Sequence, residues 1–343
     1  MRSSGRPRPR RRAAIKALSA LAALAAALAI AGPGAAGPEL QHVSLAKTST
    51  GVQLILPDIA VKMGYFNRHG IDATITMVVG DAGSIPALVS GSVNVAIMTA
   101  TPCLIAVAKG ARMQMVAPLS TYPQQIVMRK VLADRLGITA ATPLAEKLQA
   151  LRGRTVAVLD VGGGLMYQLR AALVSNGIDP KEVPVIAMSP YTSQLAALQR
   201  GAIDVIAPAI PYGQIAVSEG FGVMIANVWA GEVPSIRGQV FQVLSAETGW
   251  AGAHAETIKA VRAALSDAMN YLHANPAAAA ELAHELQPNI PLAVLNAVIG
   301  NGTGYPTTTT ISRKDFEGMQ SFAKLSGADT ASVTYNRVVW SGP

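Results

Sequence analysis

The sequence predicts an α/β fold built from mainly parallel sheets flanked by helices. Short apolar segments rich in β-branched residues alternate with helix-like segments along the chain, and glycines or prolines separate them. The alternation occurs twice, once in residues 43–117 and again in residues 155–227. Parallel strands need crossover connections, which are usually helices, so each repeat indicates one sheet with helices over it.

The first repeat is the most regular part of the chain. Glycines end its helices, and Pro57 and Pro102 lie where helices begin. We expect Asp81 and Thr101 to cap helices. The predicted strands are 43–46, 71–79 and 93–98, and the predicted helices end at 63, 89 and 109.

The second repeat follows a polar connection, residues 120–125, and a polar helical segment, 131–148, that Pro143 interrupts. Its predicted strands are 126–128, 155–158, 183–188, 202–207 and 223–227, and its predicted helices include 165–175 and 194–199. Residues 240–244 form one more strand. Helices follow at 255–274 and 277–286, and Ser312 caps a third with Asp315 three residues on.

Residues 64–110 carry a pattern that resembles a known family. It consists of Gly64-Tyr65-Phe66, a strand after Gly70, a helix ending in Ser90-Gly91, and the strand 93–98. Leu151 to Val158 and Asp204 match the family further on. The pattern is similar to substrate-binding proteins of ABC importers for nitrate, sulfonates and taurine, the NMT1-like group.

The resemblance implies the two-lobed periplasmic-binding-protein fold of type II, with two crossovers between the lobes. Residues 37–122 and 240–343 would then form lobe one, and residues 123–239 lobe two. Asp204 is expected to be structural, because the family has an acid there whatever its ligand.

Residues 1–36 have the features of a cleaved secretory signal. Six arginines and Lys16 precede an apolar run, 17–31, and small residues follow at 34–36. The run is shorter than the roughly 20 residues that span a bilayer, which disfavours a membrane anchor. We therefore expect a periplasmic protein, and the sequence leaves the Sec and twin-arginine export routes open.

The remaining composition argues against several function classes. Seven of the 28 basic residues and none of the 20 acidic ones lie in 1–36, so the rest of the chain has a net charge near +1 and indicates no nucleic-acid partner. Cys103 is the only cysteine, and the five histidines do not cluster. The sequence predicts no metal, no cofactor and no catalytic residues.

Candidate ligand-binding residues of lobe one follow its strands, where open α/β sheets bind ligands. They are Thr48, Ser49 and Thr50 after the first strand and Thr99 and Thr101 at the end of another. Ordinary capping of turns and helices is the alternative role for each.

Candidates in lobe two include Gly162, Gly163 and Gly164, which precede a helix start and would let backbone approach a ligand. A glycine-rich turn without a ligand is the alternative. Further candidates are the tyrosines Tyr122, Tyr191 and Tyr212, and Arg237, whose guanidinium suits an anion. The alternatives are a hinge tyrosine packed on Pro123 for Tyr122 and an ordinary surface arginine for Arg237.

Together these features predict a monomeric solute-binding protein that delivers a small organic anion, sulfonate- or carboxylate-like, to an ABC permease of the inner membrane. A pyrimidine-precursor biosynthetic enzyme related to the same family is one alternative, although the resemblance implies a cysteine-rich motif that this chain lacks. A periplasmic sensor that presents its bound ligand to a receptor is another.

Overall fold

The structure is a computed structural model, which describes Met1 and residues 40–300 and 302–342. The predicted signal, residues 1–36, lies outside the described residues apart from Met1. The chain divides into two units, Met1–Leu40 and Gln41–Pro343, and the fold described below is that of the second unit.

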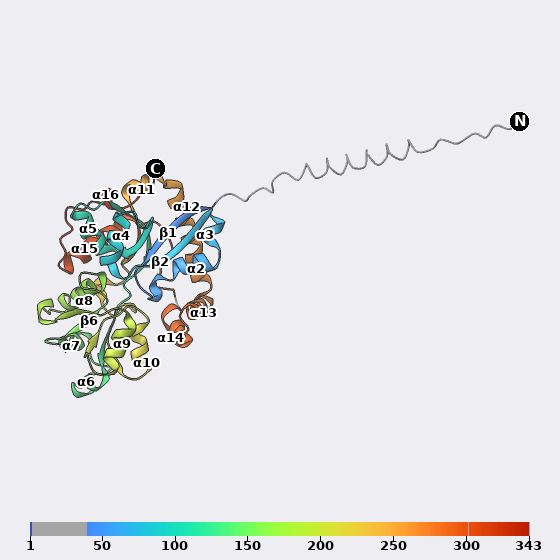
Figure 1. The fold of residues 1–343 in the computed structure, drawn as a ribbon. Coiled ribbons are helices and arrows are strands. Elements are labelled where there is room, and N and C mark those ends of the chain that lie inside the picture. Colours follow the sequence, from blue (N-terminus) through green and yellow to red (C-terminus); the bar gives the residue numbers. More distant parts are fainter. Residues whose placement is uncertain (2–39, 301, 343) are drawn as a thin grey trace. The chain divides into compact units, whose positions relative to one another are not determined.

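Two five-stranded sheets organise residues 41–343 (Figure 1). The first sheet has the order β2-β1-β3-β10-β4 and the second has the order β7-β6-β8-β5-β9. The strands of the first sheet are β1 (Gln41–Lys47), β2 (Ile71–Met77), β3 (Val95–Thr99), β4 (Met113–Ser120) and β10 (Gln242–Glu247). Those of the second are β5 (Gln125–Arg129), β6 (Val156–Val158), β7 (Val185–Ala187), β8 (Val205–Ile206) and β9 (Gly222–Asn227).

The two-lobed α/β fold with mainly parallel sheets is thus confirmed, and each sheet contains one antiparallel strand. In the first sheet β1 pairs parallel with β2 and β3, whereas β10 pairs antiparallel with β3 and β4. The second sheet repeats this arrangement, with β6 parallel to β7 and β8, and β5 antiparallel to β8 and β9. The antiparallel strand in each sheet is the one that arrives through a crossover, which the sequence periodicity does not reveal.

Helices cover both sheets. Those that precede the first crossover or follow the second are α2 (Leu56–Lys62), α3 (Tyr65–Arg68), α4 (Gly80–Val89), α5 (Ala100–Ala108), α11 (Thr248–Ala253), α12 (Ala255–Ala274), α13 (Pro276–Leu286), α14 (Leu292–Ile299), α15 (Arg313–Leu325) and α16 (Tyr335–Val338). Those between the crossovers are α6 (Lys130–Arg135), α7 (Leu144–Gln149), α8 (Gly164–Val174), α9 (Tyr191–Gln199) and α10 (Tyr212–Ser218). Single 3-10 turns lie at η1 (Val52–Leu54), η2 (Pro180–Glu182) and η3 (Pro234–Ile236).

Two predicted helix caps are wrong. Strand β3 continues to Thr99, which is the residue before α5, so Thr101 lies inside the first turn of that helix and is buried. Helix α4 begins at Gly80, so Asp81 belongs to its first turn and does not cap it. Both errors arise because the strand-to-helix connections are shorter than the sequence suggests.

Other local predictions are confirmed. Helix α12 has the predicted bounds and buries Ile258, Leu265 and Leu272 along one face, as its 3.6-residue periodicity requires. Ser312 and Asp315 form a reciprocal capping box at the start of α15. Cys103 is buried in α5, where its thiol lies 3.9 Å from the Ser245 hydroxyl.

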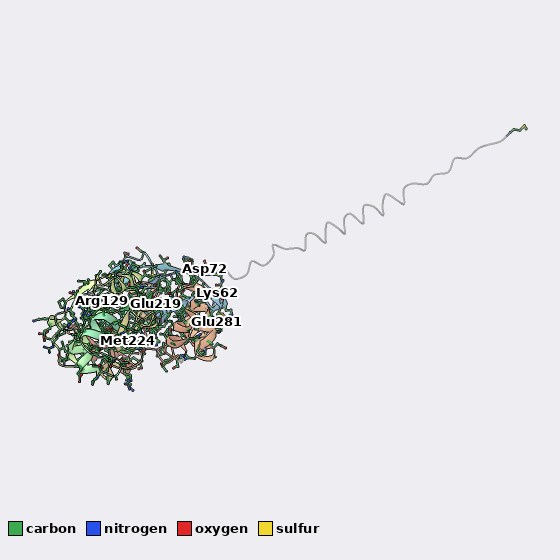
Figure 2. The ribbon with its side chains drawn as sticks, turned by 90° about the horizontal axis from the view of Figure 1, so that it is seen from below. Lys62, Asp72, Arg129, Glu219, Met224 and Glu281 are labelled. Atoms are coloured by element: carbon green, nitrogen blue, oxygen red, sulfur yellow. The ribbon has the colours of Figure 1, made fainter. Side chains whose placement is uncertain are left out.

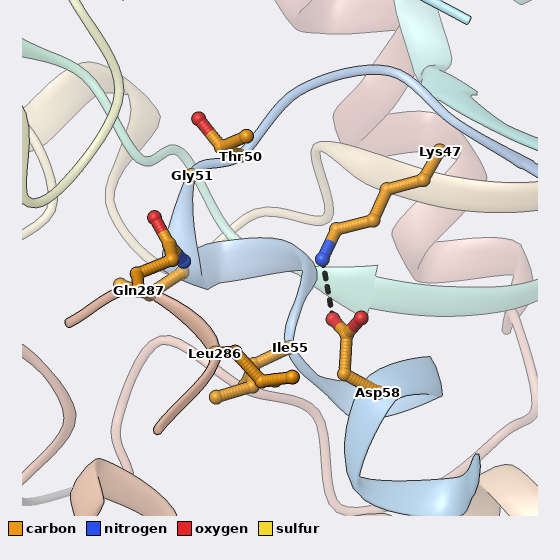
Figure 3. A pocket seen from close by; sticks show the side chains of 8 residues that line it. Lys47, Thr50, Gly51, Ile55, Asp58, Leu286 and Gln287 are labelled. Atoms are coloured by element: carbon orange, nitrogen blue, oxygen red, sulfur yellow. Dashed lines mark hydrogen bonds and ion pairs between the residues drawn. The ribbon is translucent and has the colours of Figure 1, made fainter. Parts of the chain in front are cut away.

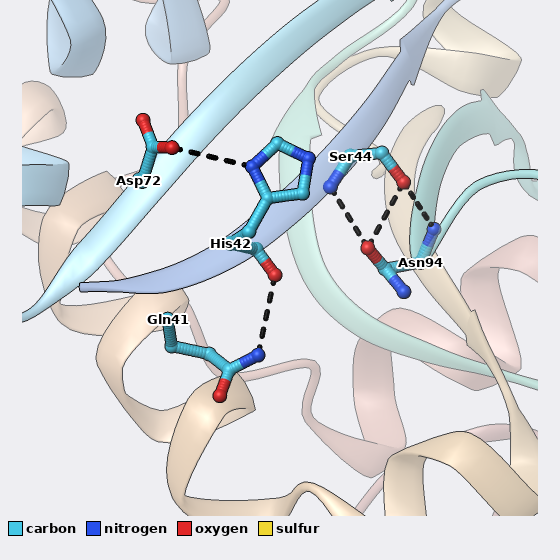
Figure 4. Close-up of polar contacts among 5 residues, drawn as sticks. All are labelled: Gln41, His42, Ser44, Asp72 and Asn94. Carbon is cyan, nitrogen blue, oxygen red and sulfur yellow. Dashed lines mark hydrogen bonds and ion pairs between the residues drawn. The ribbon is translucent and has the colours of Figure 1, made fainter. Parts of the chain in front are cut away.

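Side chains link the strands at one edge of the first sheet (Figure 4). His42 on β1 lies directly opposite Asp72 on β2, and their side chains contact at 3.3 Å. The Asn94 carboxamide oxygen accepts from the Ser44 backbone N–H and hydroxyl, both at 2.9 Å, just before β3 begins. These contacts hold the three strands in register.

The C-terminal helices pack back onto the first helices of the chain. An ion pair of 2.9 Å joins Lys62 at the end of α2 to Glu285 on α13. Figure 2 labels Lys62 and another residue of α13, Glu281. Within the described residues, no helix is long and apolar enough to cross a membrane. The same residues contain no group of three or more His, Cys, Asp or Glu placed to hold a metal ion.

Candidate functional site

Elements of both sheets line one small cavity, which we call the acidic cavity. It encloses about 20 Å³, room for one water-sized molecule. It lies where strands β1, β3 and β6 end, as expected for a ligand site of an α/β protein. Its lining residues are Thr48, Ser49, Gln53, Gly80, Asp81, Thr99, Leu159, Asp160, Gly164, Leu165, Tyr191 and Gln242.

Asp81 is the buried centre of this site, with 5% of its surface exposed. Its carboxylate accepts from the Thr99 backbone N–H at 2.8 Å and from the Thr99 hydroxyl at 2.6 Å. The Gly164 N–H, at the start of α8, donates to the same carboxylate at 3.1 Å. Burial raises the pKa of Asp81, and these hydrogen bonds oppose the shift. The carboxylate of Asp81 therefore joins the first sheet to the second.

Asp160, two residues after the end of β6, makes the reciprocal contact. Its carboxylate accepts from the Asp81 backbone N–H at 3.2 Å, and from that of Ala82, in the first turn of α4. A carboxylate is well placed there because the N–H groups at a helix start are unpaired. Burial, and then the negative charge of Asp81, raise the pKa of Asp160 to about 6. We call the part of the protein that contains the first sheet the first half, and the part that contains the second sheet the second half. Each carboxylate thus binds the start of a helix in the other half.

Two glycines make this close approach possible. A Cβ at Gly164 would lie 2.5 Å from Thr99 Cβ, which no side chain could occupy without moving the two halves apart. Gly80 has φ of 72°, and a Cβ there would lie 2.8 Å from the Asp160 carboxylate. Both positions therefore require glycine for the contacts seen between the sheets.

Two tyrosines form an aromatic wall beside the carboxylates. The ring centroids of Tyr191 and Tyr212 are 4.9 Å apart, and Tyr191 is almost fully buried. The Tyr191 hydroxyl bonds the Ser49 side chain, and burial raises the pKa of Tyr191. The Tyr212 hydroxyl lies 2.6 Å from the Thr50 hydroxyl. Each tyrosine belongs to the second half of the protein and each hydroxyl partner to the first.

A second cavity, of about 170 Å³, lies beside the loop that follows β1 (Figure 3). We call it the Lys47 cavity. The Lys47 ammonium pairs with the Asp58 carboxylate, and both side chains are largely buried. Its other lining residues are Thr50, Gly51, Val52, Ile55, Leu286 and Gln287. This cavity contains charges of both signs, whereas the acidic cavity contains two carboxylates and no Lys, Arg or His.

The profile of the NMT1-like family matches residues 38–287. The chain belongs to the NMT1-like family. A search of curated protein sequences found no match.

Solved structures with the same fold resemble this NMT1-like protein over most of its length. A protein of Bordetella bronchiseptica RB50 superposes with a TM-score of 0.75 and 22% identity, over 88% of this chain and 95% of that one. The alkanesulfonate-binding protein SsuA of Xanthomonas axonopodis pv. citri, bound to MOPS, superposes with a TM-score of 0.67 and 19% identity. The match covers 85% of this chain and 93% of that one. The periplasmic nitrate-binding protein NrtA of Synechocystis PCC 6803 superposes with a TM-score of 0.68 and 18% identity. The match covers 86% of this chain and 84% of that one.

Several candidates predicted from the sequence come together in this member of the family. Thr48, Ser49, Thr99, Gly164 and Tyr191 line the acidic cavity. Thr50 lines the Lys47 cavity, and Tyr212 contacts both Thr50 and Tyr191. Ligand contact by these residues stays a prediction.

The remaining candidates line neither cavity. Thr101 is buried in α5, and Tyr122 is buried between Phe241 and Phe322. The Arg237 guanidinium donates to the Gly231 carbonyl at 2.6 Å and 2.9 Å, which closes the loop between them.

Among the three glycines of the strand-to-helix turn, the structure separates the roles. Gly162 has a positive φ of 93°. Gly163 has φ of −81°, which any residue can adopt, although a Cβ there would collide with the Asp160 carboxylate. Gly164 is the one that permits contact with Thr99.

The residues that set the charge of the site do not stand out in the sequence. The sequence predicts a helix-capping role for Asp81 and no role for Asp160, Gln53 and Gln242. Asp160 could have been noticed, because it precedes the glycines at the end of a predicted strand. Gln242 has no such signal, since only the antiparallel insertion of β10 brings it to the cavity.

Proposed function

We propose that the protein is a periplasmic solute-binding protein that closes around a small molecule and delivers it to an ABC permease. The observation that supports this most strongly is the acidic cavity, which residues from both halves line. Two hydrogen bonds cross between the halves there: the Gly164 N–H donates to the Asp81 carboxylate, and the Asp81 N–H donates to the Asp160 carboxylate. Binding between two α/β halves is the arrangement that hinge closure requires.

The mechanism follows from the two crossovers. The chain passes between the sheets once between β4 and β5 and once between β9 and β10. A cavity of 20 Å³ admits no organic molecule, so a ligand enters only when the two halves rotate apart about these connections. A ligand that then contacts both halves favours the closed form by its higher affinity for it.

The related structures support binding rather than catalysis. SsuA is described as an alkanesulfonate-binding protein and NrtA as a nitrate-binding protein, and NrtA is described as periplasmic. We extend these properties to this protein as part of the proposal, together with a monomeric state and an inner-membrane permease as partner.

The expected ligand class, a small organic anion, has support from those two relatives. The charges in the acidic cavity argue against it, because an anion would face Asp81 and Asp160 without a basic side chain to bind. The proposed function stands on the two-sided cavity and does not depend on the sign of the ligand's charge.

A thermal-shift screen of sulfonates, carboxylates, nitrate, pyrimidines and amines tests the proposal. At least one compound should raise the melting temperature in a concentration-dependent way, and it should leave the purified protein chemically unchanged. Turnover of the bound compound would instead support the biosynthetic enzyme. If no compound binds, the proposed function is wrong.

A further inference from the structure

The acidic cavity brings two carboxylates together and supplies no basic side chain to neutralise them. Asp81 comes from the first turn of α4 and Asp160 from the turn after β6, so they belong to different halves of the protein. Their present partners are the backbone N–H groups of Gly164, Asp81 and Ala82 and the Thr99 backbone and hydroxyl. These groups are dipoles and carry no compensating positive charge.

Two glutamines give an independent indication that the cavity holds a polar ligand. The side-chain oxygens of Gln53 and Gln242 have no hydrogen-bond partner among the described residues, and the two residues are 1% and 4% exposed. Both line the acidic cavity. Buried polar atoms are nearly always hydrogen-bonded, so these two residues offer free acceptors to a ligand that carries N–H donors.

We propose that the acidic cavity binds a small organic cation, an amidinium or a primary ammonium, whose N–H groups bridge Asp81 and Asp160. The inference rests on the proposed solute-binding function and specifies the ligand of the same site. A planar amidinium matches a carboxylate with two parallel hydrogen bonds, and its remaining N–H groups would reach the glutamine oxygens.

Opening of the cavity makes both carboxylates available. When the halves move apart, Asp81 loses the Gly164 N–H and Asp160 loses the N–H groups of α4. Each half then carries one carboxylate that lacks the donors it has in the closed form. A cation between them replaces those bonds on both sides at once, which is what draws the two halves together.

The aromatic wall suits the body of such a ligand. Tyr191 lines the cavity, and the Tyr212 ring packs against it in a tilted arrangement, with the ring centroids 4.9 Å apart. Aromatic rings attract cations through their negatively polarised faces, so this wall favours the same charge as the carboxylates do.

The opposite ligand class makes a distinct prediction. An anion would have to bind the N–H groups at the starts of α4 and α8, in competition with Asp160 and Asp81. Removing the Asp160 charge would therefore strengthen anion binding and weaken cation binding. The sign of the Asp160→Asn effect separates the two classes.

Calorimetry with compounds matched in shape and opposite in charge provides the test. The pairs are benzamidine with benzoate, butylamine with butyrate, and putrescine with succinate, and ethanesulfonate and nitrate extend the anion set. We expect at least one cation to bind at least tenfold more tightly than its anionic partner at pH 8. Asp160→Asn should lower the affinity for that cation at least tenfold. Asp134→Asn, which removes an exposed charge on α6, should leave the affinity unchanged.

The pH dependence gives a second readout. Asp81 and Tyr191 are the titratable groups that interact with Asp160, and Tyr212 lies against Tyr191; the pKa of each of these three is raised. Both tyrosines stay neutral between pH 5 and 8, so cation affinity should fall as the pH drops through about 6, the pKa of Asp160. In Asp160→Asn this dependence should flatten.

The failures are distinguishable. If an anion binds more tightly than every cation, and Asp160→Asn raises the affinity for that anion, the cation inference is overturned and the solute-binding function stands. If the cation binds equally well to Asp160→Asn and to the parent protein, the assignment of the carboxylates is wrong. If no compound binds, the proposed function fails and the inference falls with it.

Discussion

The two cavities beside the first strand differ in how their carboxylates are compensated. In the Lys47 cavity the Asp58 carboxylate has an ammonium partner from the same half of the protein (Figure 3). In the acidic cavity Asp81 and Asp160 come from different halves and have only neutral donors. The first carboxylate is therefore satisfied however the halves move, whereas the other two depend on closure.

This difference teaches which charges serve the fold and which are available for binding. A buried charge with a resident counterion stabilises its own surroundings and has little left to offer a ligand. A buried charge without one keeps a raised pKa and favours a ligand that can neutralise it. Substitutions in each cavity can therefore distinguish a charge that stabilises the fold from a charge that binds a ligand.

The largest effect is expected from Gly164→Val. The new side chain would collide with Thr99 and hold the acidic cavity open, so ligand affinity should fall about 100-fold, or about 2.7 kcal/mol. Calorimetry with a ligand from the screen measures the loss. Gly252→Val is the matched control, because a Cβ at that position in α11 would meet no atom within 4 Å outside the neighbouring backbone of its own helix. Equal affinities for both variants would show that closure does not need the Gly164 contact.

Lys47→Met should lower the free energy of unfolding by about 2 kcal/mol, because it leaves the largely buried Asp58 carboxylate without its charged partner. Urea denaturation measures the change. Lys62→Met is the control, since its ion pair with Glu285 is exposed and should contribute less than about 1 kcal/mol. The charge preference of the acidic cavity should be unaffected, and a changed preference would mean that the cavities are coupled.

Asp160→Asn should stabilise the protein without ligand at pH 8, by about 1.5 kcal/mol. The folded-state pKa of Asp160, about 6, lies above its ordinary value of 3.8, so the folded state binds the proton more tightly and loses stability as the pH rises from about 4 through 6. The variant's advantage should therefore be full above pH 6 and vanish near pH 4. Melting temperatures at both pH values provide the measurement, and a variant less stable than the parent at pH 8 would contradict the assignment.

The smallest effect is expected from Thr50→Val, which removes the hydrogen bond to the Tyr212 hydroxyl. The cost should stay below about 1 kcal/mol, because the Gln287 side chain lies 3.4 Å from the same hydroxyl and can accept in its place. Urea denaturation compares it with Thr76→Val at an exposed position of β2. A cost well above that of the control would indicate that this contact between the halves matters for stability.

Much of the fold was predictable because its signals are local. Strand β1, helix α12 and the capping box at Ser312 are determined by periodicity and by residues within one turn of one another. The mixed pairing was not predictable, since the direction of β10 depends on a partner more than 100 residues away.

The site was predictable only in part, for the same reason. Strand ends locate Thr48, Thr99 and Gly164, because parallel strands bring their carboxyl ends to one edge. The negative charge of the site could not be predicted, because the role of Asp81 depends on the Gly164 N–H, which belongs to the other half of the protein. Arg237 was the best basic candidate in the sequence, yet a local carbonyl occupies its guanidinium.

The central place of β10 in the first sheet has a consequence for biosynthesis. Strands β3 and β4 are complete by residue 120, but they do not pair with each other. Strand β10, residues Gln242–Glu247, lies between them and pairs with both. During synthesis or translocation the second sheet has therefore emerged in full before the first one can close. Nascent chains that end before residue 242 expose two strand edges to neighbouring molecules, which is the situation that invites aggregation and chaperone binding.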